Sequence, residues 1–228
     1  MSVDYNDFAK TFSNSRKNLK WEEIDYFLSN PHLTSPKGEE ISILDIWCGN
    51  WRFLWILKKS PLIRGDLEGF NYLWVDLSKW LLTEAKKLHP ENEFLELNML
   101  DISKIKQKFN HIFFIASFHH LNTIKDRKKV LSKAYDLLED WGKIYMTNWA
   151  LNSELNKEKY SDSIMNSSEN EFWSLDYIVK IGQHNRYYHC FDLSELEYLF
   201  IETWFEIIEN REFENKRNFV SIIQKKWD

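Results

Sequence analysis

The stretch Ile43-Leu44-Asp45-Ile46-Trp47-Cys48-Gly49-Asn50-Trp51-Arg52-Phe53-Leu54 decides the fold class. The apolar run 41–46 predicts a buried strand with Asp45 at its end. The pattern over 52–59 predicts a helix, which Ser60-Pro61 stops. A strand, a short loop and a helix in this order are typical of open α/β sheets, in which ligands bind beyond the carboxyl ends of the strands.

The same alternation extends on both sides of this stretch. A strand that ends at Asp76 precedes a helix for which Ser78 is a suitable N-cap. Alternating strands and helices predict a parallel sheet with helices on both faces, and two late strands are close enough in sequence to form a hairpin. We expect strands at 41–46, 72–75, 94–97, 111–116, 143–147, 205–208 and 219–223, and helices at 4–29, 52–59, 79–88, 123–138 and 194–202, the last capped by Asp192 or Ser194. Residues 151–185 are polar and too irregular for assignment.

Composition excludes several classes of protein. The chain has 228 residues, 43% hydrophobic and 29% charged, which favours one globular domain. No apolar run reaches the roughly 18 residues of a membrane span, and the polar N-terminus is not a secretory signal. Cys48 and Cys190 cannot form a disulfide framework, so we expect a reduced, cytoplasmic setting and no membrane partner. A net charge of −5 argues against binding nucleic acid by charge alone.

One count is abnormal, because the chain has 11 Trp and only 6 Gly. Glycine normally makes up about 7% of a globular protein. An α/β protein needs glycine at tight turns and at helix C-caps, where the backbone takes positive φ. With so few glycines, the chain should be short of such turns and C-caps.

Asp76 indicates the class of ligand. A carboxylate at the end of the second strand can accept hydrogen bonds from both hydroxyls of a ribose. The pairing of this acid with the loop after the first strand predicts a nucleoside-containing cofactor, which could be a nicotinamide dinucleotide or an adenosyl compound.

Four motifs together resemble the class I S-adenosylmethionine-dependent methyltransferases with a type 11 methyltransferase domain. The family's loop D-x-G-C-G-x-G is matched by Asp45-Ile46-Trp47-Cys48-Gly49-Asn50-Trp51. The others are Val75-Asp76-Leu77-Ser78, Phe118-His119-His120-Leu121 and Leu137-Leu138-Glu139-Asp140-Trp141-Gly142-Lys143. The resemblance covers about 41–149 and the 205–225 hairpin. It implies a doubly wound, Rossmann-like, seven-stranded and mostly parallel sheet with helices on both faces and a C-terminal antiparallel hairpin.

The resemblance also implies a division of the chain and a set of site residues. The division is an N-terminal helical segment (1–40), the cofactor-binding core (41–149), a substrate-side insertion or lid (150–192) and a closing helix and hairpin (193–228). His119 is the candidate catalytic residue, as base or as a group that orients the acceptor, and no metal is expected. The residues implied in binding S-adenosylmethionine are Asp45, Trp47, Cys48, Gly49, Asn50, Trp51, Asp76, Leu77, Asn98, Met99 and Ser117.

The chain departs from the family at several glycines. Two of the three loop glycines are Trp47 and Trp51, whose indoles would fill the space that the cofactor needs. The same replacement recurs at Trp74, Trp80, Trp141 and Trp204. Drift does not change one residue into the same other residue at six structural glycines. Reading UGA codons as tryptophan in a genetic code where UGA means glycine would produce this pattern.

A segment near the C-terminus indicates the methyl acceptor. Arg186-Tyr187-Tyr188-His189-Cys190-Phe191, with the helix that follows, is similar to the R-Y-Y-H-x-F segment of the methyltransferases that esterify 5-carboxymethyluridine at the tRNA wobble position. Arg186 can pair with a carboxylate or phosphate, and Tyr187, Tyr188 and His189 could stack on a splayed base. The expected partner is tRNA. Because the chain is acidic overall, we expect help in holding tRNA, either from a small activating protein subunit or from the basic helix face around Lys128.

Three other functions stay open at this stage. One is methylation of a small molecule. Another is a non-catalytic, methyltransferase-like scaffold, if the tryptophans of the loop are genuine. The third is a nicotinamide oxidoreductase, which the loop sequence and His119-His120 disfavour.

Overall fold

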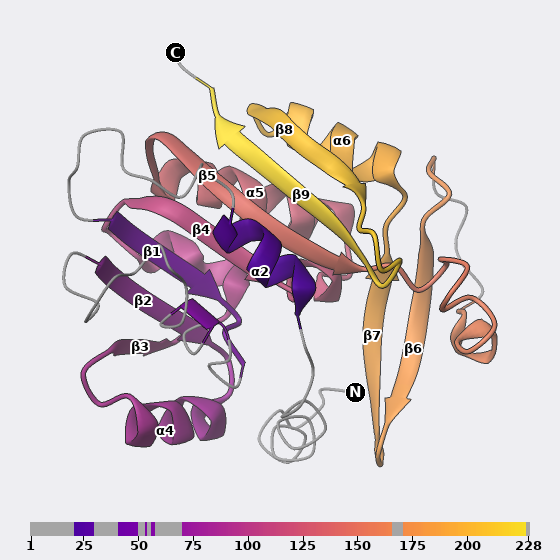
Figure 1. Cartoon of the computed structure of the whole chain (residues 1–228), viewed down its shortest axis with the longest axis horizontal. Helices are drawn as coiled ribbons and strands as arrows, with labels where there is room; N and C mark the ends of the chain where they lie inside the picture. Colours follow the sequence, from indigo (N-terminus) through magenta and orange to yellow (C-terminus); the bar gives the residue numbers. More distant parts are fainter. Residues whose placement is uncertain are drawn as a thin grey trace.

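The central feature of the fold is a seven-stranded sheet (Figure 1). The computed structural model describes residues 21–29, 41–49, 53, 56–57, 70–165 and 171–226. The strand order is β3-β2-β1-β4-β5-β9-β8; β1 to β5 are parallel, and β9 and β8 are antiparallel to their neighbours. The predicted fold class is confirmed. The strands are β1 (Ile41–Ile46), β2 (Phe70–Asp76), β3 (Glu93–Glu96), β4 (Phe109–Ile115), β5 (Leu138–Trp149), β8 (Phe205–Glu212) and β9 (Asn218–Lys225).

Helices cover both faces of this sheet, and each face has its own apolar core. On one face, Phe27 of α2 packs edge-on against Tyr145 of β5, with ring centroids 5.4 Å apart. On the other, Leu131 and Phe200 belong to a second buried cluster. The first face carries α2 (Glu22–Ser29) and α4 (Lys79–Leu88); the second carries α5 (Ile124–Leu137), α6 (Leu193–Glu202) and the short 3-10 helices η2 (Met99–Lys104) and η3 (Phe118–His120).

Side-chain caps fix where the helices begin. The Ser78 hydroxyl accepts the Leu81 N–H at 3.3 Å, as predicted for α4. Asp192, and not Ser194, caps α6, because the Asp192 carboxylate accepts the Ser194 N–H at 2.8 Å. Most of the predicted helices 4–29 and 52–59 lies outside the described residues; Phe53, Ile56 and Leu57 are helical.

A two-stranded antiparallel sheet, absent from the sequence prediction, stands across the end of the main sheet at which β5 finishes (Figure 1). It consists of β6 (Leu175–Ile181) and β7 (His184–Cys190), and η4 (Ser161–Ser163) precedes it. The prediction missed β7 because its sequence, HNRYYHC, lacks the alternation of apolar and polar residues that marks a half-buried strand. No helix in the described ranges is both long and apolar enough to cross a membrane.

Candidate functional site

Asp45 is a buried carboxylate at the carboxyl end of β1. It lies between Trp74 of β2 and Phe113 of β4 in the sheet register and is 1% exposed. Neither carboxylate oxygen has a hydrogen-bond partner among the residues that the structure describes. Burial, with the nearby charge of Asp76, raises the pKa of Asp45 well above its usual value. Two buried acceptor atoms without partners mark a place where a ligand with donor groups fits.

Asp76, at the end of β2, is held by the backbone of the neighbouring loops. Its carboxylate accepts the Gly49 N–H at 2.9 Å and the Ser78 N–H at 2.7 Å. Burial raises the pKa of Asp76, although these two hydrogen bonds and the charge of Arg186 act in the opposite direction. The carboxylate therefore has a fixed orientation at the sheet edge.

The loop after β1 bends back over the end of β2. The Val75 carbonyl accepts the N–H groups of Trp47 and Cys48 at 2.7 and 3.1 Å. Trp47 has φ 62°, in the left-handed region, and its indole centroid lies 5.7 Å from that of the His120 ring. Burial raises the pKa of the Cys48 thiol well above its usual value, so this cysteine stays protonated. Asn50 and Trp51 lie outside the described residues.

The other predicted cofactor contacts surround this loop. Leu77 follows Asp76, and the Leu97 N–H donates to the Asp76 carbonyl at 3.0 Å, so the end of β3 lies beside it. The Asn98 side chain accepts the Leu100 N–H at 2.9 Å and caps η2, whereas Met99 is fully buried in the core. After β4, the buried hydroxyl of Ser117 has no hydrogen-bond partner within the described part of the chain. No three His, Cys, Asp or Glu side chains among the described residues gather as metal ligands.

The Nδ1 atoms of the two histidines of η3 have opposite hydrogen-bonding roles, one as acceptor and the other as donor. Nδ1 of His119 accepts the Trp149 N–H at 3.1 Å, so a neutral His119 carries its proton on Nε2. Nδ1 of His120 lies 2.8 Å from the Tyr187 carbonyl, which can only accept, so a neutral His120 has its lone pair on Nε2. His119 is 1% exposed. The geometry therefore makes His120, which the site prediction omitted, the better candidate for an acceptor-side base.

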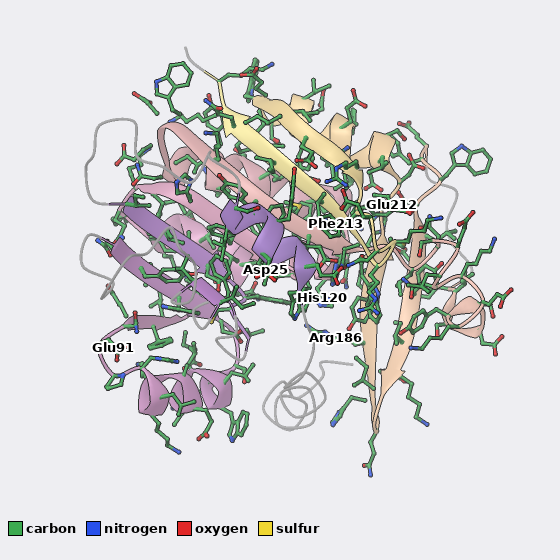
Figure 2. All side chains as sticks on the ribbon, in the orientation of Figure 1. Asp25, Glu91, His120, Arg186, Glu212 and Phe213 are labelled. Carbon is green, nitrogen blue, oxygen red and sulfur yellow. The ribbon has the colours of Figure 1, made fainter. Side chains whose placement is uncertain are left out.

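β7 brings two of the predicted acceptor residues to this site. The Tyr188 ring centroid lies 4.6 Å from that of His120 and 5.0 Å from that of Trp149. The Arg186 guanidinium lies 5.7 Å from the centre of the Tyr188 ring, and its charge acts on Asp76. Figure 2 shows Arg186 and His120 where the main sheet meets the two-stranded sheet of β6 and β7.

The other two predicted acceptor residues have different neighbours. Side chains alternate across a strand, so Tyr187 and His189 lie on the opposite face of β7 from Arg186 and Tyr188. The Tyr187 hydroxyl and His189 Nδ1 both contact Asp176 Oδ1 at 2.7 Å. The structure therefore does not bring the four residues together on one surface, and only Arg186 and Tyr188 lie at the sheet edge.

Comparisons with known proteins show the family and the fold. Residues 37–212 match the family model described as "Methyltransferase domain". A protein of Encephalitozoon cuniculi, named as a candidate methyltransferase, is 25% identical over 212 residues, 90% of this chain and 87% of that protein. The structure is similar to an S-adenosylmethionine-dependent methyltransferase of Clostridium acetobutylicum, with TM-score 0.65, 15% identity and coverage of 98% and 99% of the two chains.

A further similar structure contains ligands. It is the 1,6-didemethyltoxoflavin N1-methyltransferase of Burkholderia thailandensis, solved with 1,6-didemethyltoxoflavin and S-adenosylhomocysteine. The TM-score is 0.57 at 14% identity, and the match covers 100% of this chain and 92% of that one. At this identity the likeness shows a shared fold.

Proposed function

This chain belongs to the methyltransferase domain family, and we propose that it transfers the methyl group of S-adenosylmethionine to a carboxylate on a modified tRNA wobble uridine. The first part of the proposal concerns the donor and rests on the acidic groups at the sheet edge. The second part concerns the acceptor and rests on residues of β7. The two parts are tested separately.

The donor site fits the chemistry of S-adenosylmethionine. Asp76 would accept hydrogen bonds from the ribose hydroxyls, and the partnerless oxygens of Asp45 would accept from the cationic amino-acid end. The Ser117 hydroxyl offers a further donor and acceptor. When bound, S-adenosylmethionine supplies a methyl group on a positively charged sulfur. The chain's own residues hold the donor in place and align the acceptor.

Arg186 is the observation that carries the acceptor proposal. A carboxylate is already nucleophilic at neutral pH, so its methylation depends on positioning more than on a base. Arg186 projects from β7 toward the edge that Asp76 and His120 occupy, where its fixed fork of donors can pair with a carboxylate or a phosphate. The Tyr188 ring, between Arg186 and the two histidines, offers a stacking surface for a base.

Incubation of host tRNA with labelled cofactor tests the acceptor directly. We expect label on tRNA, and we expect Arg186→Gln to raise KM for tRNA while leaving cofactor affinity intact, because the lost contact is on the acceptor side. Asn185→Ala, at an exposed neighbour on the same strand, is the matched control. Label only on small carboxylic acids would instead assign a small-molecule methyltransferase.

We further propose that the protein made by its own host carries glycine at 47, 51, 74, 80, 141 and 204. Trp47, Trp141 and Trp204 support this proposal, since their φ angles of 62°, 66° and 71° lie in the region that favours glycine. Trp74 lies within β2 and Trp80 within α4, so their support is their place in the family motifs alone. Trp51 lies outside the described residues.

Two measurements test the glycine proposal. Peptide mass spectrometry of host-made protein should give glycine masses at 47 and 51, and tryptophan masses there would refute it. Calorimetry should detect S-adenosylmethionine binding by the Trp47→Gly/Trp51→Gly chain and none by the tryptophan-containing chain. If the host-made protein has both tryptophans and binds no cofactor, the chain is a non-catalytic scaffold, which the partly buried Trp47 indole beside His120 would explain.

A further inference from the structure

A buried ionic network lies on the face of β7 that points away from the sheet edge. His189 is its centre, with Nδ1 at 2.7 Å from Asp176 Oδ1 and Nε2 at 2.8 Å from Glu195 Oε2. Arg127 of α5 donates to the other oxygen of Glu195 at 2.9 Å. Further donors are the Tyr187 hydroxyl to Asp176 and the Ser174 hydroxyl to Glu195. The network thus joins β6, β7, α5 and α6.

The geometry defines the charge of the network. An ionised carboxylate can only accept, so an imidazole with both nitrogens against carboxylate oxygens must be doubly protonated. Burial alone would raise the pKa values of Asp176 and Glu195. Both pKa values nevertheless lie below their usual values, because His189, the Tyr187 and Ser174 hydroxyls and Arg127 stabilise the two anions. Two cations then balance two anions in a site where His189, Arg127 and Glu195 are almost completely buried.

The network is connected to the proposed acceptor side through the backbone of β7. Arg186 and Tyr188 alternate along this strand with Tyr187 and His189, so fixing one pair fixes the direction of the other. The Tyr187 carbonyl also accepts from His120 Nδ1 at 2.8 Å and so determines which nitrogen of His120 carries the lone pair. Any shift of β7 would therefore displace Arg186 and release His120 together.

We propose that His189, as an imidazolium held between Asp176 and Glu195, is a positioning residue for the acceptor, acting through Arg186 and His120. This inference rests on the proposed function for its kinetic consequence, but not for the charge state of His189. Buried ion pairs contribute little net stability compared with apolar packing of equal volume. Their directed hydrogen bonds instead select one orientation of the strand, which an active site needs.

The first experiment examines the native protein. Nitrogen-15 NMR of labelled histidine should show His189 with protons on both ring nitrogens at neutral pH. Chemical shifts of a neutral tautomer would overturn the proposal. This measurement needs no substrate, no cofactor and no variant.

The second experiment separates positioning from stability. In the form of the chain that binds S-adenosylmethionine, we expect His189→Gln to raise KM for the acceptor about tenfold and to change kcat at saturation and donor affinity less than about twofold. Ile223→Ala, which removes apolar contacts from β9 and touches neither the network nor β7, is the control and should leave KM unchanged. Equal KM increases in both variants would reduce His189 to a structural role. If Arg186→Gln changes no acceptor KM, the proposed function fails, whereas the NMR result still decides the charge state.

Discussion

At the scale of single residues, Trp204 has a backbone conformation that its side chain opposes. It follows the Thr203 C-cap of α6, and its N–H donates to the Ile201 carbonyl at 3.1 Å, which is a hydrogen bond typical of a helix C-terminus. Its φ is 71°, and its side chain is 73% exposed. The strain is therefore not compensated by burial of the indole.

We expect Trp204→Gly to raise the free energy of unfolding by about 1 kcal/mol, the scale of the left-handed penalty for a residue with a Cβ. Trp173→Gly is the matched control, because Trp173 is 87% exposed and is not among the residues with positive φ. The control should leave stability unchanged or lower it slightly. Urea denaturation of the three proteins gives the comparison, and a loss of stability in Trp204→Gly would contradict the expectation.

Asp45 is expected to lower the stability of the ligand-free protein when it is ionised. Its folded-state pKa is raised, mainly by burial and then by Asp76, so ionisation disfavours the folded state. Without ligand, the native chain should lose stability relative to Asp45→Asn as pH rises above about 4, the usual range of an aspartate. Chemical denaturation across this range measures the difference.

The same substitution should also abolish the measurable S-adenosylmethionine binding of the chain with glycine at 47 and 51. In the denaturation experiment, an equal pH dependence of the unfolding free energy in the native chain and in Asp45→Asn would contradict the burial of Asp45.

At the scale of elements, two neighbouring residues near the start of β5, Trp141 and Gly142, restrict the side chain in different ways. Trp141 has φ 66° and is half exposed. A Cβ on Gly142 would lie 2.8 Å from the Glu139 carbonyl oxygen, too close for any side chain. The register between β4 and β5 is irregular at this point, between the pairs Phe109–Leu138 and His111–Lys143.

We therefore expect opposite effects from two adjacent substitutions. Trp141→Gly should stabilise the fold by about 1 kcal/mol by relieving the left-handed backbone strain. Gly142→Ala should destabilise it by about 1–3 kcal/mol, the scale of overpacking. Thermal denaturation measures both, and the same sign for the two changes would mean that the turn differs from the one described.

Elements differ in how far the sequence determines them. α4 agrees with its predicted range because Ser78 caps it and its apolar residues have helical spacing. β6 and β7 were not predicted, since the polar residues of β7 are buried against partners from α5 and α6 that lie far away in sequence. A strand stabilised by an ionic network has no local apolar pattern to detect.

At the scale of the whole molecule, charge limits how the chain could hold the tRNA that we propose as its acceptor. The net charge is −5, and the basic face of α5 is partly neutralised by acidic residues. Lys128 pairs with Glu202 at 3.0 Å and donates to the Tyr198 hydroxyl at 2.8 Å, while Lys133 pairs with Asp136 at 2.9 Å. Lys128 thus joins α5 to α6, and its charge is already paired within the chain.

We expect Lys128→Gln to leave the affinity for the proposed tRNA acceptor within about twofold of the native value, because Lys128 is already paired with Glu202 and Tyr198. A lysine that contacts a phosphate would instead change the salt dependence by about one counterion. Arg186→Gln is the comparison and should weaken binding. Filter binding at several salt concentrations measures both. A lower salt slope in Lys128→Gln would place the tRNA footprint on α5.

The sequence by itself determined the fold class, the family resemblance and the acidic residues near the ends of β1 and β2. It also marked Trp47, Trp141 and Trp204, whose φ angles lie in the region that favours glycine. These features are local, because strand runs, caps and turn residues act on their own neighbours in the chain. The tertiary structure alone decided that Arg186 and Tyr188 reach the sheet edge while Tyr187 and His189 join a buried network, and that His120 presents its Nε2. Those outcomes depend on which residues from β6, α5 and α6 meet β7, and no local pattern in the sequence specifies long-range partners.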